Sequence, residues 1–311
     1  MKNGITRVTL IWTMLVFVNC GLTNAQPNYP TDHDKAELIY SDVENFLEAF
    51  KILNKTSDTV AVLNEYYFDR ASAGLKEYIG KHNLTSELLK GAMIKDPERY
   101  AKIADFFANR ASFIPVFKTT MQGFNHVLPS AMYPPTYLLV GANRGIAQAS
   151  KFGQLVTITK VLDNDEKLKK LIVHELSHFQ QAMSLGIQAY GAVYSKPNNM
   201  LDLCLREGGA EYITFLVLNE ITQAKSLVYF QDNESDLKSR FMMDLAQQNT
   251  KFWLWDSIDD PDTPNLLGYV MGYKICEAYY QNTSDKKTAL NDILAITQPE
   301  EFLESSNYIP K

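Results

Sequence analysis

The chain has 311 residues, of which 46% are hydrophobic, and it carries a formal net charge of −6 at pH 7. A chain of this length and composition can bury a core of ordinary size, in one large domain or in two closely joined lobes. The negative charge argues against nucleic acid or an anionic membrane surface as a partner.

The first 25 residues have the pattern of a secretory signal peptide. Lys2 and Arg7 precede an apolar run over residues 8–18, and small and polar residues then lead to Ala25. This run is too short for a bilayer core of about 30 Å, so we expect cleavage after Ala25 and release to the periplasm or the medium. Cleavage removes two positive charges and no negative ones, which takes the net charge from −6 to −8. Cys20 lies in a segment that faintly resembles a bacterial lipobox, so lipid attachment there is an alternative.

Residues 26–128 are predicted to form a helical lobe. Apolar residues recur at helical spacing in five stretches, 34–53, 59–79, 86–93, 97–109 and 113–126. The aromatic residues within these stretches are expected to belong to the core. No stretch beyond the leader approaches 18 consecutive apolar residues, so we expect a mature protein without a membrane span.

Residues 129–311 are predicted to form a second region that continues from the helical lobe as one domain. The segments 134–141 and 153–159 are apolar and rich in β-branched residues, and they predict two strands joined by a loop over 142–152. The second strand comes directly before the most informative helix of the chain. If that strand lies at a sheet edge, it could hold an extended peptide by strand addition, and a purely structural sheet is the alternative.

Further helices are predicted downstream of these strands, and two loops separate them. The helices are expected over 200–219, over much of 220–250, over 265–280 and once more in the tail, with loops over 186–199 and 256–264. The sequence therefore predicts an α+β fold that is predominantly helical and has a small β-sheet next to its central helix.

His174, Glu175 and His178 form an H-E-x-x-H sequence at the centre of the helical stretch 168–181. Two histidines four residues apart lie on one face of a helix, with their Cβ atoms about 6 Å apart, so both can bind one Zn²⁺. Glu175 follows the first histidine, where its carboxylate can take a proton from a zinc-bound water. The motif also occurs by chance in surface helices. The uncharged flank 171–173 and the presence of only five histidines in the chain favour a zinc helix.

A catalytic zinc ion needs three protein ligands and one open position. No histidine follows His178, and the carboxylates Glu207 and Glu211 stand out in a largely apolar helix, where charged residues should be paired or metal-bound. Because they are four apart, one could bind zinc while the other accepts the outer N–H of a zinc-bound histidine. An ion pair with a nearby arginine or lysine is the alternative. Gly208 and Gly209 are expected to let this helix approach the H-E-x-x-H helix closely.

The sequence H-E-L-S-H, followed downstream by R-E-G-G-A-E-Y, resembles the gluzincin metallopeptidases. This resemblance implies that Glu207 is the third zinc ligand and that Glu211 supports a zinc-bound histidine, His174. The stretch 134–280, with its helix L-G-Y-V-M-G-Y-K-I, is also similar to predicted secreted zinc-dependent proteases of bacteria. The gap between His178 and Glu207 is longer than in aminopeptidase-like gluzincins, so an additional loop must fit there.

Peptide hydrolysis also requires a hydrogen-bond donor for the oxyanion that forms at the attacked carbonyl. Tyr269 and Tyr273 lie one turn apart on the helix over 265–280, which the resemblance implies is a wall of the cleft. Tyr269 is the preferred candidate, and two core tyrosines are the alternative. Cys204 and Cys276 remain after leader removal, either as a disulfide or as buried free thiols.

These patterns together predict a secreted zinc-dependent metallohydrolase, a peptidase that acts on a peptide or protein substrate. Zn²⁺ would be bound by His174, His178 and Glu207, with Glu175 and Tyr269 as catalytic residues. Two other classes of protein remain open at this stage. One is a zinc-containing binding or adaptor protein of the periplasm or cell surface without turnover. The other is a helical structural protein in which the motif is accidental.

Overall fold

The computed structural model describes residues 28–53, 57–142, 147–162, 164–255, 260 and 262–309. The predicted signal peptide, with Cys20 and the cleavage point after Ala25, lies outside these residues. Among the described residues, no helix is both long and apolar enough to cross a membrane.

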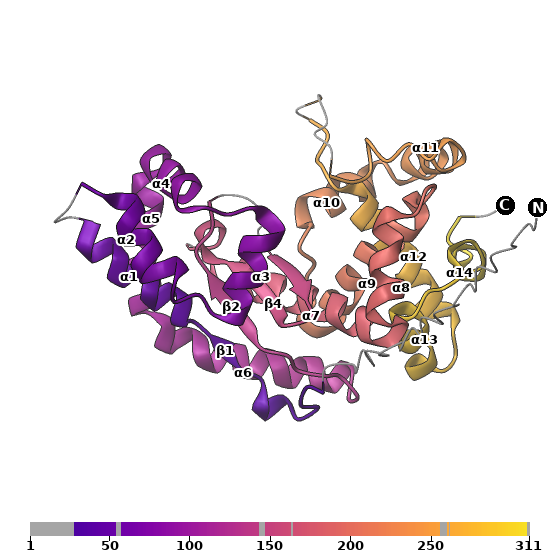
Figure 1. Cartoon of the computed structure of the whole chain (residues 1–311). Helices are drawn as coiled ribbons and strands as arrows, with labels where there is room; N and C mark the ends of the chain where they lie inside the picture. Colours follow the sequence, from indigo (N-terminus) through magenta and orange to yellow (C-terminus); the bar gives the residue numbers. More distant parts are fainter. Residues whose placement is uncertain are drawn as a thin grey trace, which may run out of the picture.

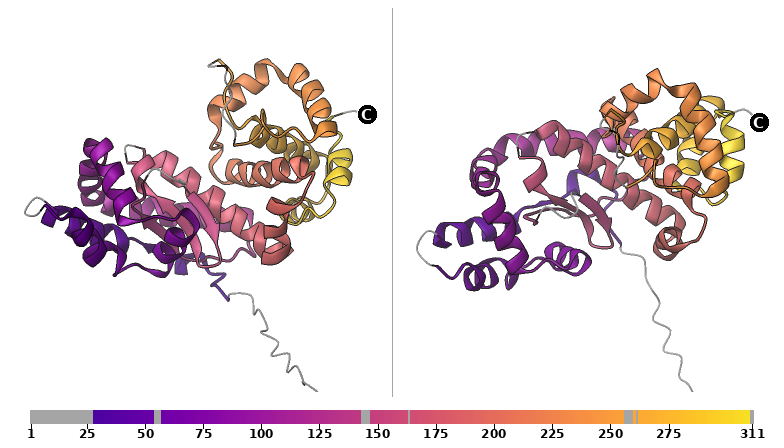
Figure 2. Two further views of the ribbon diagram at one scale, coloured as in Figure 1. Left: turned by 45° about the horizontal axis from the view of Figure 1, so that its top comes forward. Right: turned by 90° about the horizontal axis from the view of Figure 1, so that it is seen from above.

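The molecule is mainly helical and has one small β-sheet near its middle, which confirms the predicted fold class. Most of the N-terminal helices lie on one side of the sheet and the C-terminal helices on the other, with α7 (Asp165–Leu185) between them (Figures 1 and 2). The last N-terminal helix packs against α7 and a C-terminal helix. A single cluster of buried apolar side chains extends from Val43 to Leu303. The two ends of the chain therefore share one core.

The N-terminal helices differ from the predicted ones in two places. Their bounds are α1 Ser41–Leu53, α2 Thr59–Leu63, the π-helical turn η2 Asn64–Phe68, α3 Ala73–His82, α4 Ser86–Lys95, α5 Pro97–Ala108 and α6 Arg110–Val127. The helix predicted over 34–53 begins only at Ser41. It is preceded by a 3₁₀ turn, η1 (His33–Lys35), and by a two-residue strand, β1 (Leu38–Ile39).

The second difference is that the helix predicted over 59–79 is interrupted before α3. Ser72 begins a new helix there, because its Oγ accepts a hydrogen bond from the backbone N–H of Leu75. The carboxylate of the buried Asp42 in α1 accepts hydrogen bonds from both the backbone N–H and the hydroxyl of Ser72. This contact between distant parts of the chain overrides the continuous helical pattern.

The sheet has four strands in the order β1-β2-β4-β3. The other strands are β2 Thr136–Leu139, β3 Ala147–Ser150 and β4 Gly153–Thr157. β1, β2 and β4 run parallel, and β3 pairs antiparallel with β4. The expected loop over 142–152 therefore contains a strand, and the exposed edge belongs to β3 rather than to β4.

Gly153 makes the tight connection between β3 and β4 possible. Its φ is +130°, and a Cβ atom at this position would lie 1.9 Å from the carbonyl oxygen of Pro135. Only glycine fits such a conformation and such a close approach. The turn at Gly153 thus places β3 beside α7, with which it makes contacts along the sheet edge.

The C-terminal half is helical throughout most of its described length. After the 3₁₀ turn η3 (Ile158–Lys160) and α7, its elements are α8 Ile187–Ala192, η4 Val193–Ser195, α9 Met200–Leu218, α10 Ala224–Asp232, α11 Glu234–Gln247, α12 Leu267–Asn282, α13 Lys286–Leu294 and α14 Pro299–Ser306. The loop expected over 186–199 is thus largely helical, and the tail holds two helices where one was predicted.

Helix α9 lies between α7 and α12, and glycines determine how closely it packs. A Cβ atom at Gly208 would lie 2.0 Å from the backbone of Gly272 in α12, whereas one at Gly209 would lie 3.0 Å from Gln181 of α7. The prediction that both glycines face α7 was therefore wrong for Gly208. Cys204 and Cys276, on these same two packed helices, are buried free thiols.

Candidate metal centre

Two adjacent helices supply the side chains of the candidate site. α7 carries His174, Glu175 and His178, and α9 carries Glu207 and Glu211. All five side chains are buried. The α7 helix begins where Asn164 accepts a hydrogen bond from the backbone N–H of Lys167, a local N-cap that sets its start.

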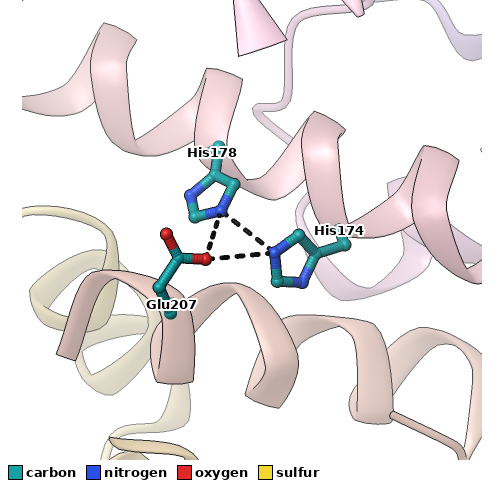
Figure 3. Close-up of side chains that lie close together, drawn as sticks. All are labelled: His174, His178 and Glu207. Atoms are coloured by element: carbon teal, nitrogen blue, oxygen red, sulfur yellow. Dashed lines mark hydrogen bonds and ion pairs between the residues drawn. The ribbon is translucent and has the colours of Figure 1, made fainter. Parts of the chain in front are cut away.

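Three donor atoms of these residues converge on one point (Figure 3). The Nε2 atoms of His174 and His178 are 3.0 Å apart, and Oε2 of Glu207 lies 3.1 Å from His178 Nε2 and 3.4 Å from His174 Nε2. A tetrahedral zinc site with bonds of 2.0–2.1 Å has edges of about 3.3 Å. The triangle formed by the three atoms therefore has the size of one face of such a site.

The outer ring nitrogens indicate which tautomer each histidine adopts. His178 Nδ1 lies 2.9 Å from the amide oxygen of Gln181, which can only accept a hydrogen bond, so this nitrogen carries the proton. His174 Nδ1 lies 3.2 Å from Oε1 of Glu211, within ion-pair distance although not aligned as a hydrogen bond. Both Nε2 atoms then present lone pairs to each other and to a carboxylate oxygen, an arrangement that a cation stabilises.

The charges of the site favour a cation as well. Burial lowers the pKa of His174, but Glu211 and Glu207 outweigh this effect and raise the pKa well above its ordinary value. Burial raises the pKa of Glu207, but His178 and His174 reverse this and hold the pKa well below the ordinary value. An ionised Glu207 beside two imidazoles attracts positive charge. These residues therefore fit a zinc ion in donor type, spacing and charge.

Glu211 is fully buried, and a residue outside the predicted site positions it. Its Oε2 accepts a hydrogen bond from the backbone N–H of Thr222 at 2.7 Å, and its Oε1 contacts the Thr222 hydroxyl. Sequence reasoning missed Thr222, because it lies beyond the end of α9 and belongs to no motif. It also missed Gln181, which could have been inferred from its position three residues after His178 on the same helix.

Glu175 lies beside this triad and faces a cavity of about 610 Å³. Burial raises the pKa of Glu175, whereas the neighbouring His178 and His174 lower it, and the net direction is upward. The backbone of Ala149 in the edge strand β3 also lowers the pKa of this carboxyl. Glu175 is thus held between the histidines and the sheet edge, at the floor of the cavity.

The two candidate tyrosines of α12 have different surroundings. The Tyr269 ring lies nearly parallel to the His174 ring, with centroids 6.1 Å apart, and it borders the cavity. Its hydroxyl oxygen accepts a hydrogen bond from Trp255 Nε1 at 3.0 Å. Tyr273 instead packs against Tyr212 and donates its hydroxyl proton to a neighbouring carboxylate. Only Tyr269 of this pair lies at the candidate centre.

Comparison with known proteins gives one match. A family model described as "Predicted Zn-dependent protease (DUF2268)" matches residues 139–303, just over half of the chain. No curated protein and no solved structure matches. The matched segment contains both helices of the candidate centre and the aromatic residues around its cavity.

Proposed function

The chain belongs to this family of predicted zinc-dependent proteases, and from this premise we propose that it is an exported zinc metallopeptidase of the gluzincin type. The observation that carries the proposal is the convergence of His174, His178 and Glu207 at the floor of a cavity that Glu175 also lines. A gluzincin takes its third ligand from a glutamate of a later helix, and Glu207 of α9 has that relation to the H-E-x-x-H helix. The predicted leader supports export.

Zinc, when bound, would polarise the peptide carbonyl and lower the pKa of an attacking water toward about 7. Glu175 takes the proton of that water and later transfers it to the leaving nitrogen. Tyr269 is the proposed donor to the oxyanion. Because Trp255 donates to the oxygen of Tyr269, the tyrosine's own proton is available for that purpose. Gln181 favours the tautomer of His178 in which Nε2 is the free ligand atom, and the carboxylate of Glu211, 3.2 Å from His174 Nδ1, would favour the same tautomer in His174.

The sheet edge supports a peptide as the substrate. β3 is the outer strand next to α7, and its residues Ala147–Ser150 border the same cavity as Glu175. An extended peptide could lie along this strand and reach the candidate centre. The sequence suggests 153–159 as the strand that receives the peptide, but β4 is an inner strand, so the edge strand β3 takes this role.

Metal analysis combined with one substitution tests this function. We expect the purified mature chain to contain about one zinc ion per chain and to cleave peptides, with activity lost on chelation. Glu175→Gln should retain the zinc ion, because Glu175 is not a ligand. It should lose at least about 10²-fold in kcat, because the group that accepts the proton is gone.

A matched substitution on the same helix is Glu166→Gln in the first turn of α7, which should leave kcat unchanged. If Glu175→Gln cleaves peptides as fast as the wild type, the assigned mechanism is wrong. If the wild type binds zinc and cleaves no peptide in a broad library, the protein is instead a non-catalytic zinc-binding protein.

A further inference from the structure

A group of aromatic side chains forms one side of the cavity next to the candidate centre. We call Tyr190, Tyr194 and Trp255 the aromatic wall. Tyr190 comes from α8, Tyr194 from η4 and Trp255 from the segment after α11, and all three border the cavity. The wall therefore forms only when two segments more than 60 residues apart in the chain meet.

The rings of the aromatic wall contact one another and also the candidate centre. Tyr194 has its ring centroid 5.8 Å from that of Tyr190 and 6.4 Å from that of Trp255. The Tyr190 ring lies 6.3 Å from the His178 ring. The wall thus begins at one candidate ligand and, through the hydrogen bond from Trp255 to Tyr269, ends beside the other histidine.

The polar atoms of the aromatic wall are partly paired with one another. The hydroxyls of Tyr190 and Tyr194 are 3.2 Å apart and share one hydrogen bond, and the indole N–H of Trp255 donates to Tyr269. The guanidinium of Arg206 lies 5.2 Å from the centre of the Tyr190 ring and holds that ring by a cation–π contact. The wall consequently presents mostly ring surface and few free hydrogen-bonding groups, which suits an apolar ligand better than a hydroxyl-rich sugar.

The outer part of the aromatic wall is exposed in spite of its size. Trp255 is 55% and Tyr194 42% exposed, although large aromatic side chains gain most from burial. The edge strand β3 also borders the cavity, and its residues Ala147 and Ala149 are small. An extended peptide lying on β3 would leave room for a large side chain that reaches across to the wall.

We propose that the aromatic wall is a specificity site that binds a large apolar side chain, preferably an aromatic one, of the substrate residue next to the cleaved bond. The inference rests on the proposed peptidase function, because it is the peptide on β3 that positions this side chain. We place the bound side chain next to the cleaved bond because the wall contacts His178 and Tyr269, which lie at the proposed reacting centre. Covering the exposed rings of Tyr194 and Trp255 supplies the binding free energy.

The first test is cleavage of a mixed peptide library, with the cut sites identified by mass spectrometry. The zinc-loaded wild type should cut next to Phe, Tyr or Leu at least about tenfold faster, in kcat/KM, than next to Gly or Asp. Tyr194→Ala should lose most of this preference and still cut other sites. Tyr194→Phe keeps the ring and should keep the preference. Tyr66→Ala, a tyrosine on the N-terminal side outside the cavity, is a matched control and should behave as the wild type.

The second test measures binding without turnover, in Glu175→Gln. A capped peptide with a central Phe should bind at least about tenfold more tightly than its Gly counterpart, and Tyr194→Ala should abolish the difference. The mature chain keeps two tryptophans, and Trp253 is fully buried, so a blue shift in emission on peptide binding reports Trp255. This shift should be absent with the Gly peptide.

The two tests separate the specificity site from the peptidase function. Cleavage without an apolar preference, or a preference that survives Tyr194→Ala, would overturn the aromatic wall as a specificity site and leave the peptidase intact. Selective binding of the Phe peptide without any Glu175-dependent cleavage would support the site and refute the peptidase. If the protein shows neither selective binding nor cleavage, both the specificity site and the peptidase function are wrong.

Discussion

Glu207 and Glu211 lie one turn apart on α9, yet their surroundings give them different roles. Oε2 of Glu207 faces both Nε2 atoms, whereas Glu211 is fully enclosed between His174 Nδ1 and Thr222. The first carboxylate is therefore in position to bind an ion. The second lies behind His174 and accepts hydrogen bonds from Thr222, and we propose that it orients this histidine.

These surroundings predict a ranking of zinc affinities. Glu207→Ala removes a ligand and should abolish stoichiometric zinc. Glu211→Ala should weaken zinc binding by about 10–100-fold, the usual effect of removing a group that supports a ligand. Thr222→Val removes one of two hydrogen-bond donors to Glu211 and should have the smallest effect. Zinc titration against a chelating dye measures all three. If Glu211→Ala loses zinc and Glu207→Ala keeps it, the third ligand has been misassigned.

At the scale of whole elements, the contact between α9 and α12 determines where Glu207 lies. The helices touch through backbone at Gly208 and Gly272, and a Cβ atom on Gly272 would lie 1.8 Å from the carbonyl oxygen of Cys204. Backbone cannot yield as a flexible side chain can. A side chain at this crossing must therefore separate the two helices and shift the turn of α9 that bears Glu207.

Gly272→Ala should accordingly lower both stability and zinc affinity. We expect the free energy of unfolding in urea to fall by at least about 2 kcal/mol, as for other overpacked helix contacts. Gly91→Ala in α4 is the matched control, since nothing lies within 4 Å of a Cβ atom there. It should raise stability by up to about 1 kcal/mol through helix propensity. Equal effects of the two substitutions would show that the close crossing is unimportant.

The elements that could be predicted from sequence are those with local signals. α5, α7, α9 and α12 carry long apolar faces, and the first two also have side-chain N-caps. β1 and β3 could not be predicted, because Leu38–Ile39 continues a helical pattern and Ala147–Ser150 is short and contains no β-branched or aromatic residue. β1 exists through a long-range pairing with β2, which no local pattern encodes, whereas β3 forms a short hairpin with β4.

The same division applies to the candidate site. His174 and His178 could be selected from their spacing, and Glu207 and Glu211 from their charges within an apolar helix, whereas the choice of Glu207 as the ligand comes from the family resemblance. Thr222 and the aromatic wall could not, because they come from segments whose positions depend on how α8, α10 and the region after α11 pack. Local sequence patterns thus indicate the candidate metal ligands, but they do not indicate which residues form the walls of the cavity.

At the scale of the whole molecule, the candidate ligands belong to helices that share one core with the rest of the chain. Zinc binding should therefore add to the free energy of unfolding of the whole molecule. The candidate ligands lie on α7 and α9, which pack into the cluster that runs from Val43 to Leu303. An ion that binds only the folded chain stabilises it by about 2.7 kcal/mol at a free concentration 100 times its Kd. Removing the ion leaves two imidazoles and a carboxylate facing one another without the cation that joins them.

Chelation should therefore lower the Tm of the wild type by several degrees, in a single transition, and added zinc should restore it. Glu207→Ala serves as the control, since its Tm should not respond to either treatment. Scanning calorimetry with and without chelator makes the comparison. An unchanged wild-type Tm after proven loss of zinc would contradict the coupling.

Residues that contact each other in the folded molecule are separated by very different lengths of chain. His178 and Glu207 are 29 residues apart, so the candidate metal centre needs only the closure of the segment that contains α8 and η4. The pairing of Leu38 with Thr136 in the sheet, by contrast, joins residues nearly a hundred positions apart. Contacts with short loops form sooner, because less chain entropy must be lost before they are gained. We therefore expect the candidate ligand set to assemble early, so that the chain can bind its ion before β1 takes its place at the far edge of the sheet.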